Sequence, residues 1–200
     1  MAEHGAVNSG VLGSSPSGGV WGISSVGRAG SLQGQGQEFK SPILHLHKYS
    51  KKSIMEKLYK ILSDTQASLF VLFQKTWVYH WHITGPDFYQ VHTMFGEQYN
   101  ALFEEIDRLS EHIRFLGAKP ISALSRVSEV SRISEAKSGL SEMQMIQDLL
   151  ADHKTLVEMF GEAAEVAEEL KSRGTTNLLD DLNEAHGKYI WFLRSFTESG

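Results

Sequence analysis

Cysteine is absent from the 200 residues of this chain. Disulfides and thiolate ligands are therefore excluded, and any metal must be bound by nitrogen and oxygen atoms. No apolar run approaches the roughly 20 residues that span a bilayer, and the first residues lack the charged-then-apolar pattern of a signal peptide. We expect a cytoplasmic protein that does not bind a membrane.

Two common metal-binding motifs are also missing. Larger ferritins and di-iron oxygenases use Glu-x-x-His pairs on inward-facing helices, and zinc hydrolases favour His-Glu-x-x-His. Neither motif occurs in the sequence. Both classes of enzyme are disfavoured.

The net charge of −5 is unevenly divided. Residues 1–52 carry five Lys/Arg against two acidic residues, which is +3, so the remainder carries −8. An acidic body suits cation uptake, and a weakly basic arm suits loose contact with anions. A solvated surface with a nearly neutral tail explains the same charges.

The N-terminal part of the chain has the composition of a flexible arm. Glycine alternates with serine in residues 1–40, and such a segment cannot bury enough surface to offset its ordering entropy. The alternation in residues 43–47 suggests an extended strip, whose His45 and His47 could bind a metal or simply lie on the surface. We predict an arm over residues 1–52 and a folded domain over residues 53–200.

From Ser53 onward the apolar residues follow helical spacing. Three capping boxes mark helix starts: Ser53 with Glu56, Asp87 with Gln90, and Ser141 with Gln144. Gly85-Pro86 ends the first helix, and Gly117 ends the second.

The rest of the chain predicts a crossover and two further helices. Residues 121–140 form the crossover, with a short helix near 123–127. The third helix covers about 142–171, with Gly174 at its C-terminal end. Thr175 or Thr176 caps a fourth helix that ends near Phe196. This connectivity predicts an all-α fold, a ferritin-like four-helix bundle with a long crossover between helices two and three.

Four side chains around the first helical reversal could bind a metal: His80, His92, Asp107 and Glu111. Asp107 and Glu111 lie on one helical face, yet 15 residues separate His92 from Asp107, which is about 22 Å of helix. One metal centre spans only about 4 Å between ligands. If these residues share a centre, the histidines come from one subunit and the carboxylates from another, as in a symmetric dimer. Taken singly, each carboxylate is better explained as an exposed acidic residue, and each histidine as one whose hydrogen bonds are made within the protein.

Several short motifs, taken in their order along the chain, resemble those of the Dps mini-ferritins across about residues 53–197. They are His80-Trp81, Gly85-Pro86-Asp87-Phe88, His92, the run Asp107–Arg114, Leu116-Gly117 and Lys188–Arg194. The resemblance implies a shell of twelve subunits that oxidises Fe(II), often with hydrogen peroxide, and stores Fe(III) mineral inside. It also implies a ferroxidase centre between two-fold related subunits, which agrees with the distance argument.

The resemblance assigns a role to each candidate residue. His80 and His92 correspond to the histidine ligands of one subunit, and Asp107 and Glu111 to the carboxylates of its partner, with Glu111 bridging two irons. Trp81 corresponds to the aromatic residue beside the centre, where an indole could intercept one-electron oxidants.

Some positions depart from the family pattern. Gly96 stands where an acidic residue is usual, so the second iron position loses a carboxylate. His82 replaces a common Asn and either supplies a nitrogen or faces solvent. The family's acidic pore is only partly present: Asp180, Asp181 and Glu184 are candidates, whereas Gly187 replaces an expected acid.

We therefore expect an iron-storage ferroxidase that acts on Fe(II)/Fe(III) and protects against oxidative damage. The alternative is a shell that binds or compacts DNA around a weakened metal centre, which would place it at the nucleoid. Few positive charges in the arm argue for weak, salt-dependent DNA binding. A structural assembly unit, whose arm docks onto another molecule, is a third hypothesis.

Overall fold

The structure, a computed structural model, describes residues 42–198, with side chains from Lys51 onward. The predicted disorder of residues 1–40 and the side chains of His45 and His47 lie outside the described part. The described residues form five helices and no strand: α1 (Pro42–His82), α2 (Phe88–Phe115), α3 (Leu124–Val130), α4 (Glu142–Glu169) and α5 (Arg173–Thr197).

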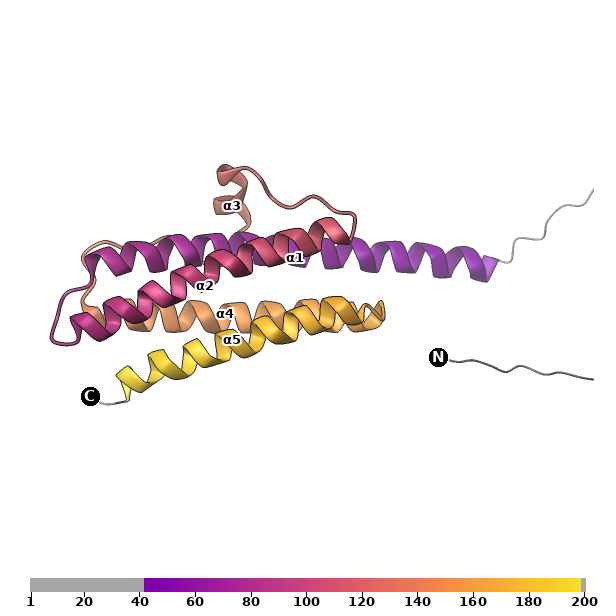
Figure 1. Cartoon of the computed structure of the whole chain (residues 1–200). Helices are drawn as coiled ribbons and strands as arrows, with labels where there is room; N and C mark the ends of the chain where they lie inside the picture. The colour runs from indigo at the N-terminus through magenta and orange to yellow at the C-terminus, as the bar shows by residue number, and fades with distance from the viewer. Residues whose placement is uncertain (1–41, 199–200) are drawn as a thin grey trace, which may run out of the picture. The chain divides into compact units, whose positions relative to one another are not determined.

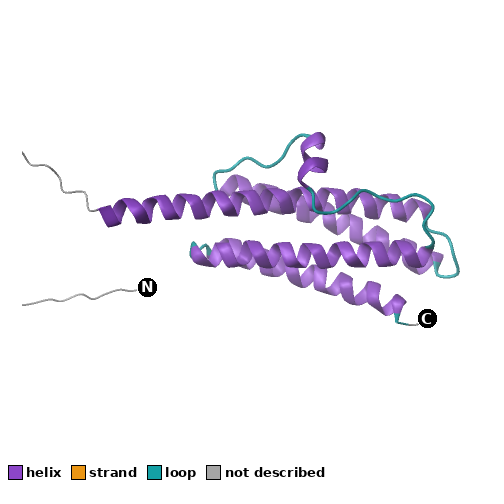
Figure 2. Cartoon of the chain, turned by 180° about the vertical axis from the view of Figure 1, so that it is seen from behind, coloured by secondary structure: helices purple, strands orange, loops and turns teal. Residues whose placement is uncertain are grey.

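The four long helices pack as two antiparallel hairpins (Figure 1). α1 pairs with α2, α4 pairs with α5, and α1 also packs along α4. The crossover runs along the bundle from the end of α2 to the start of α4, and α3 lies within it against α1 (Figure 2). The predicted four-helix bundle with a long crossover is confirmed.

The structure confirms several of the predicted helix ends. Ser141 and Gln144 form the expected capping box. Gly117 ends α2 with a φ of 88°, a left-handed conformation that glycine adopts at little cost. α2 begins immediately after Asp87, as predicted, although the Asp87 side chain makes no capping hydrogen bond.

Other predicted helix ends were wrong. α1 begins at Pro42, so residues 43–47 are helical rather than extended, and Ser53 lies inside the helix. The reason is that extending an existing helix costs much less than nucleating one, and proline suits a first helical turn. Lys171, with a φ of 56°, takes the left-handed position assigned to Gly174, and Ser172 rather than a threonine precedes α5.

The bundle core is largely apolar, but it contains a tightly bonded polar cluster between α1 and α4. Lys75 is 1% exposed, and its Nζ donates to Asp148 at 3.1 Å and to Asp152 at 2.6 Å. Tyr79 donates to Asp148 at 2.7 Å, and the Lys137 side chain also contacts Asp148. We refer to these five residues as the lysine cluster.

The lysine cluster connects α1, the crossover and α4. Burial acts to raise the pKa of Asp148, but hydrogen bonds from Lys137, Tyr79 and Lys75 outweigh it and lower that pKa. Burial raises the pKa of Asp152 above its ordinary value despite the bond from Lys75.

Among the described helices, none has an apolar stretch long enough to cross a membrane.

Candidate metal centre

His80 and His92 face each other where α1 and α2 meet at the first reversal. Their rings stack with centroids 3.8 Å apart and an interplanar angle of 19°. The Nδ1 atom of His80 lies 2.8 Å from the carbonyl oxygen of His92, and the Nδ1 atom of His92 lies 2.9 Å from the carbonyl oxygen of His80. The two helices thus exchange a reciprocal pair of hydrogen bonds.

These hydrogen bonds determine the tautomer of both rings. A carbonyl oxygen only accepts, so each Nδ1 must carry the proton and donate it. In the neutral imidazole, Nε2 is then the unprotonated nitrogen, which is the form that binds a metal. Metal-binding histidines are commonly oriented by such a bond from the other ring nitrogen. We call His80 and His92 the histidine pair.

Gly96 lies directly against this pair. A Cβ atom at position 96 would stand 3.3 Å from Cε1 and 3.6 Å from Nδ1 of His80. A side chain at this position would therefore lie against the edge of the His80 ring. Glu97 does not replace it, because its side chain lines a cavity with Phe192 and Phe196 of α5.

Asp107 and Glu111 lie further along α2, and both are exposed. The 15 helical residues from His92 to Asp107 correspond to about 22 Å. Glu111 lines an open hollow of about 560 Å³ with Arg108, His112 and Asp181 among its walls. The chain thus carries the histidine pair and this carboxylate pair on one helix hairpin, separated along its length.

A row of exposed and half-buried rings adjoins the histidine pair. Trp77 is 39% exposed, Trp81 56% and Phe103 60%. The rings are in mutual contact, with centroids 4.8 Å apart for Trp77–Trp81 and 6.1 Å for Phe73–Phe103. We call the following residues the aromatic face: Phe73, Trp77, Trp81, Tyr99 and Phe103.

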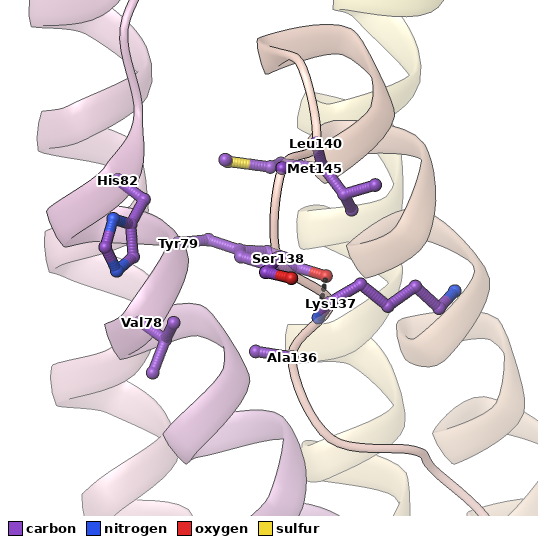
Figure 3. Close-up of a pocket in the computed structure, with 9 residues that line it drawn as sticks. Val78, Tyr79, His82, Ala136, Lys137, Ser138, Leu140 and Met145 are labelled. Atoms are coloured by element: carbon purple, nitrogen blue, oxygen red, sulfur yellow. Dashed lines mark hydrogen bonds between the residues drawn. The ribbon is translucent and has the colours of Figure 1, made fainter.

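His82 lies apart from the other two histidines. It is exposed and lines a cavity of about 310 Å³ between the end of α1 and the crossover, together with Tyr79 and Ser138 (Figure 3). The backbone N–H of Lys137 donates to the Tyr79 hydroxyl at 3.2 Å across this cavity. His82 therefore faces the crossover and solvent.

Comparison with known proteins agrees with this architecture. The family model of the ferritin-like domain matches residues 59–199. "DNA protection during starvation protein" of Brevibacillus brevis is 32% identical over 148 residues, which is 74% of this chain and 99% of that relative. The chain belongs to the Dps family.

Solved Dps structures share the fold. The X-ray structure of Dps from Thermosynechococcus elongatus aligns with a TM-score of 0.72 and 29% identity, covering 74% of this chain and 94% of that one. The Dps protein from Vibrio cholerae O1, described as a member of a broad superfamily of ferritin-like diiron-carboxylate proteins, aligns with a TM-score of 0.70 and 28% identity. That alignment covers 72% of this chain and 91% of the other. The suspected family is therefore confirmed.

This Dps-family bundle also contains a buried polar chain that the sequence analysis missed. His186 Nε2 lies 2.9 Å from Glu105 Oε2, and His186 Nδ1 lies 2.9 Å from His153 Nδ1. Burial raises the pKa of Glu105 to about 8 and lowers that of His186 to about 3. Burial also lowers the pKa of His153.

The buried chain does not form a metal site. His186 uses a different nitrogen toward each neighbour, so one ion could not be bound by all three residues. Within the described residues of one Dps chain, no group of three or more His, Cys, Asp or Glu side chains could hold a metal ion. The sequence signal for the buried chain was weak, because its members lie on three different helices.

Proposed function

We propose that the assembled protein is a ferroxidase that binds Fe(II) between two subunits, oxidises it and stores the Fe(III) product. The observation that carries this proposal is the reciprocal hydrogen bonding of the histidine pair. It prepares two unprotonated Nε2 atoms for a cation without requiring any other part of the chain. The carboxylates of Asp107 and Glu111, contributed by a partner subunit, would complete the ligand set.

The aromatic face supports the involvement of a second copy. Contiguous exposed apolar patches on a soluble protein commonly mark interaction sites, and this patch lies on the hairpin that carries all four ligands. An isologous contact around a two-fold axis would cover it on both subunits and form two centres together. We further propose the twelve-subunit hollow shell, the role of Trp81 beside the centre and the cytoplasmic location.

In this mechanism Fe(II) is the substrate. The neutral histidine pair binds it, and the two carboxylates balance its charge and stabilise Fe(III) more than Fe(II). Two Fe(II) ions reduce one hydrogen peroxide molecule by two electrons, which breaks the O–O bond. The backbone carbonyls retain the protons on Nδ1, so the histidine pair stays in its metal-binding tautomer throughout.

Mixed assemblies test the shared centre. One pool carries His80→Ala with His92→Ala, and the other carries Asp107→Asn with Glu111→Gln. Each pure pool should lose Fe(II) oxidation. Random one-to-one mixing should restore about a quarter of the sites, because half of the two-fold pairs are mixed and each of these has one intact centre.

The controls define what would contradict the proposal. Glu104→Gln alters another exposed carboxylate of α2 and should retain full activity. A separated monomer with full activity, or verified mixed shells with no recovery, would exclude ligands shared across the two-fold axis. Anaerobic Fe(II) titration before peroxide addition measures binding independently of oxidation.

DNA binding is the second candidate function, and the name of the Brevibacillus brevis relative favours it. Lys51 and Lys52 are exposed near the start of α1. We expect weak binding that disappears near physiological salt, since each arm makes few phosphate contacts. Deleting residues 1–40 should retain ferroxidase activity and remove only part of the DNA binding. Tight, salt-resistant gel shifts by the full-length shell would make DNA protection the primary function.

A further inference from the structure

Ring contacts connect the histidine pair to the surface of the aromatic face. Tyr99 stands edge-on to His80, with ring centroids 5.2 Å apart. Trp77 lies 6.1 Å from Tyr99 and 4.8 Å from Trp81, and Trp81 is largely exposed. Four rings from two helices therefore form a continuous path from a proposed ligand to the face that the partner subunit would cover.

The composition of this path suits electron transfer. Phenol and indole are the most readily oxidised aromatic side chains, whereas the benzene rings of Phe73 and Phe103 are far harder to oxidise and contribute packing. The oxidisable rings are Tyr99, Trp77 and Trp81. Of these, Tyr99 is in ring contact with His80.

The glycine at position 96 creates a need for such a donor. It places no side chain beside the His80 ring, so in the proposed centre we expect the second Fe(II) to be bound less firmly than the first. Hydrogen peroxide accepts two electrons, but one Fe(II) supplies only one. Unless another group donates the second electron, cleavage of the O–O bond releases a hydroxyl radical.

We propose that Tyr99 donates this second electron, with Trp77 and Trp81 as the next donors along the path. The inference rests on the proposed ferroxidase function. One Fe(II) gives an electron, and the Tyr99 phenol gives an electron and a proton, to one hydrogen peroxide. The products are Fe(III), one hydroxide, one water and the Tyr99 phenoxyl radical. A later Fe(II), with a proton from solvent, reduces the radical back to tyrosine.

The experiment uses the assembled full-length protein loaded with one Fe(II) per centre and mixed rapidly with hydrogen peroxide. Frozen samples are measured by electron paramagnetic resonance, and a spin trap quantifies hydroxyl radical. The wild type should give a tyrosyl radical and little trapped hydroxyl radical. Tyr99→Phe preserves the ring but removes the phenol, so the tyrosyl signal should disappear and the trapped radical should rise several-fold.

Tyr89→Phe is the matched control, because Tyr89 is an exposed tyrosine on the same helix, and it should behave as the wild type. Trp77→Phe should retain the tyrosyl signal and lose any tryptophan radical that follows it. If Tyr99→Phe gives the same spectrum and the same trapped radical as the wild type, the inference is wrong. If the wild type neither binds nor oxidises Fe(II), the proposed function fails, and the electron path fails with it.

Discussion

Polar groups in the interior of the bundle differ from those on the α1–α2 face in where their bonding partners lie. In the lysine cluster and the buried chain, charged and titratable groups bond to one another within a single subunit. On the face, the histidine pair has a fixed tautomer, but its metal-binding nitrogens and the carboxylate pair are left for other partners. The interior therefore contributes to stability within one chain, whereas the function proposed for the face requires a second subunit.

The largest effect that should separate the two regions is the removal of Lys75. Lys75→Met leaves Asp152 buried without its cation, and breaking a buried pair costs about 3–5 kcal/mol. We expect the free energy of unfolding, measured with urea, to fall by that amount. Lys60→Met is the control, because the Lys60–Asp64 pair has a lysine that is 75% exposed and such pairs contribute at most about 1 kcal/mol.

A second substitution sharpens this test. Lys75→Met combined with Asp152→Leu removes both charges and should recover much of the lost stability, because apolar packing often replaces a buried ion pair without loss. Equal losses for Lys75→Met and Lys60→Met would contradict the view that the interior depends on its internal pairing.

The next effect is a stability maximum near pH 6.5. The folded pKa values of His153 and His186 are lowered, so unfolding takes up a proton at each histidine below about pH 6.5. The pKa of Glu105 is raised from 4.5 to about 8, so unfolding releases one proton between these values. This balance holds whether Glu105 or His186 carries the proton that they share.

The dependence of the unfolding free energy on pH follows from this balance of protons. Between pH 4.5 and 6.5 unfolding takes up a net single proton, so stability falls by about 1.4 kcal/mol per unit as the pH drops. Between pH 6.5 and 8 unfolding releases one proton, so stability falls as the pH rises. Glu105→Gln should remove the alkaline slope and steepen the acid slope. Urea unfolding across this range measures both, and a flat profile would contradict buried neutral histidines.

A smaller effect distinguishes the two halves of the candidate centre. His80→Ala removes a hydrogen bond and a ring stack, so metal-free stability should fall by about 1–2 kcal/mol. Asp107→Asn alters an exposed side chain and should change stability by less than about 0.5 kcal/mol. Both should abolish Fe(II) oxidation, whereas His82→Ala should not. Both variants are compared at one fixed protein concentration. If His80→Ala and Asp107→Asn lowered the free energy of unfolding equally, Asp107 would also be contributing to the stability of the subunit.

Sequence reasoning predicted the bundle because helical periodicity and turn residues are local signals. The Gly85-Pro86 reversal and the Ser141 cap are examples. The spacing of His92 and Asp107 predicted that one chain could not bring both residues to one metal centre, and this stays a prediction. The start of α1 was missed because a five-residue alternation was given more weight than helix extension. The hydrogen bonds of the histidine pair, the contact of Tyr99 with His80 and the buried chain join residues from different helices, so spacing within one helix could not reveal them.

The smallest expected effect on stability is at Gly96, where a substitution changes both the packing against His80 and the groups available to bind iron. Gly96→Ala should gain about 0.5–1 kcal/mol of helix stability, but its Cβ would stand 3.3 Å from His80 Cε1, and the stack on His92 limits how far that ring can shift. The net change in unfolding free energy should therefore stay within about 1 kcal/mol. Gly96→Asp adds the same Cβ together with a carboxylate, so comparing the two variants separates crowding from metal binding. If the missing carboxylate weakens the second iron position, only Gly96→Asp should raise the anaerobic Fe(II) stoichiometry from one toward two per centre. Identical isotherms for the two variants would mean that the second position does not depend on an acid at residue 96.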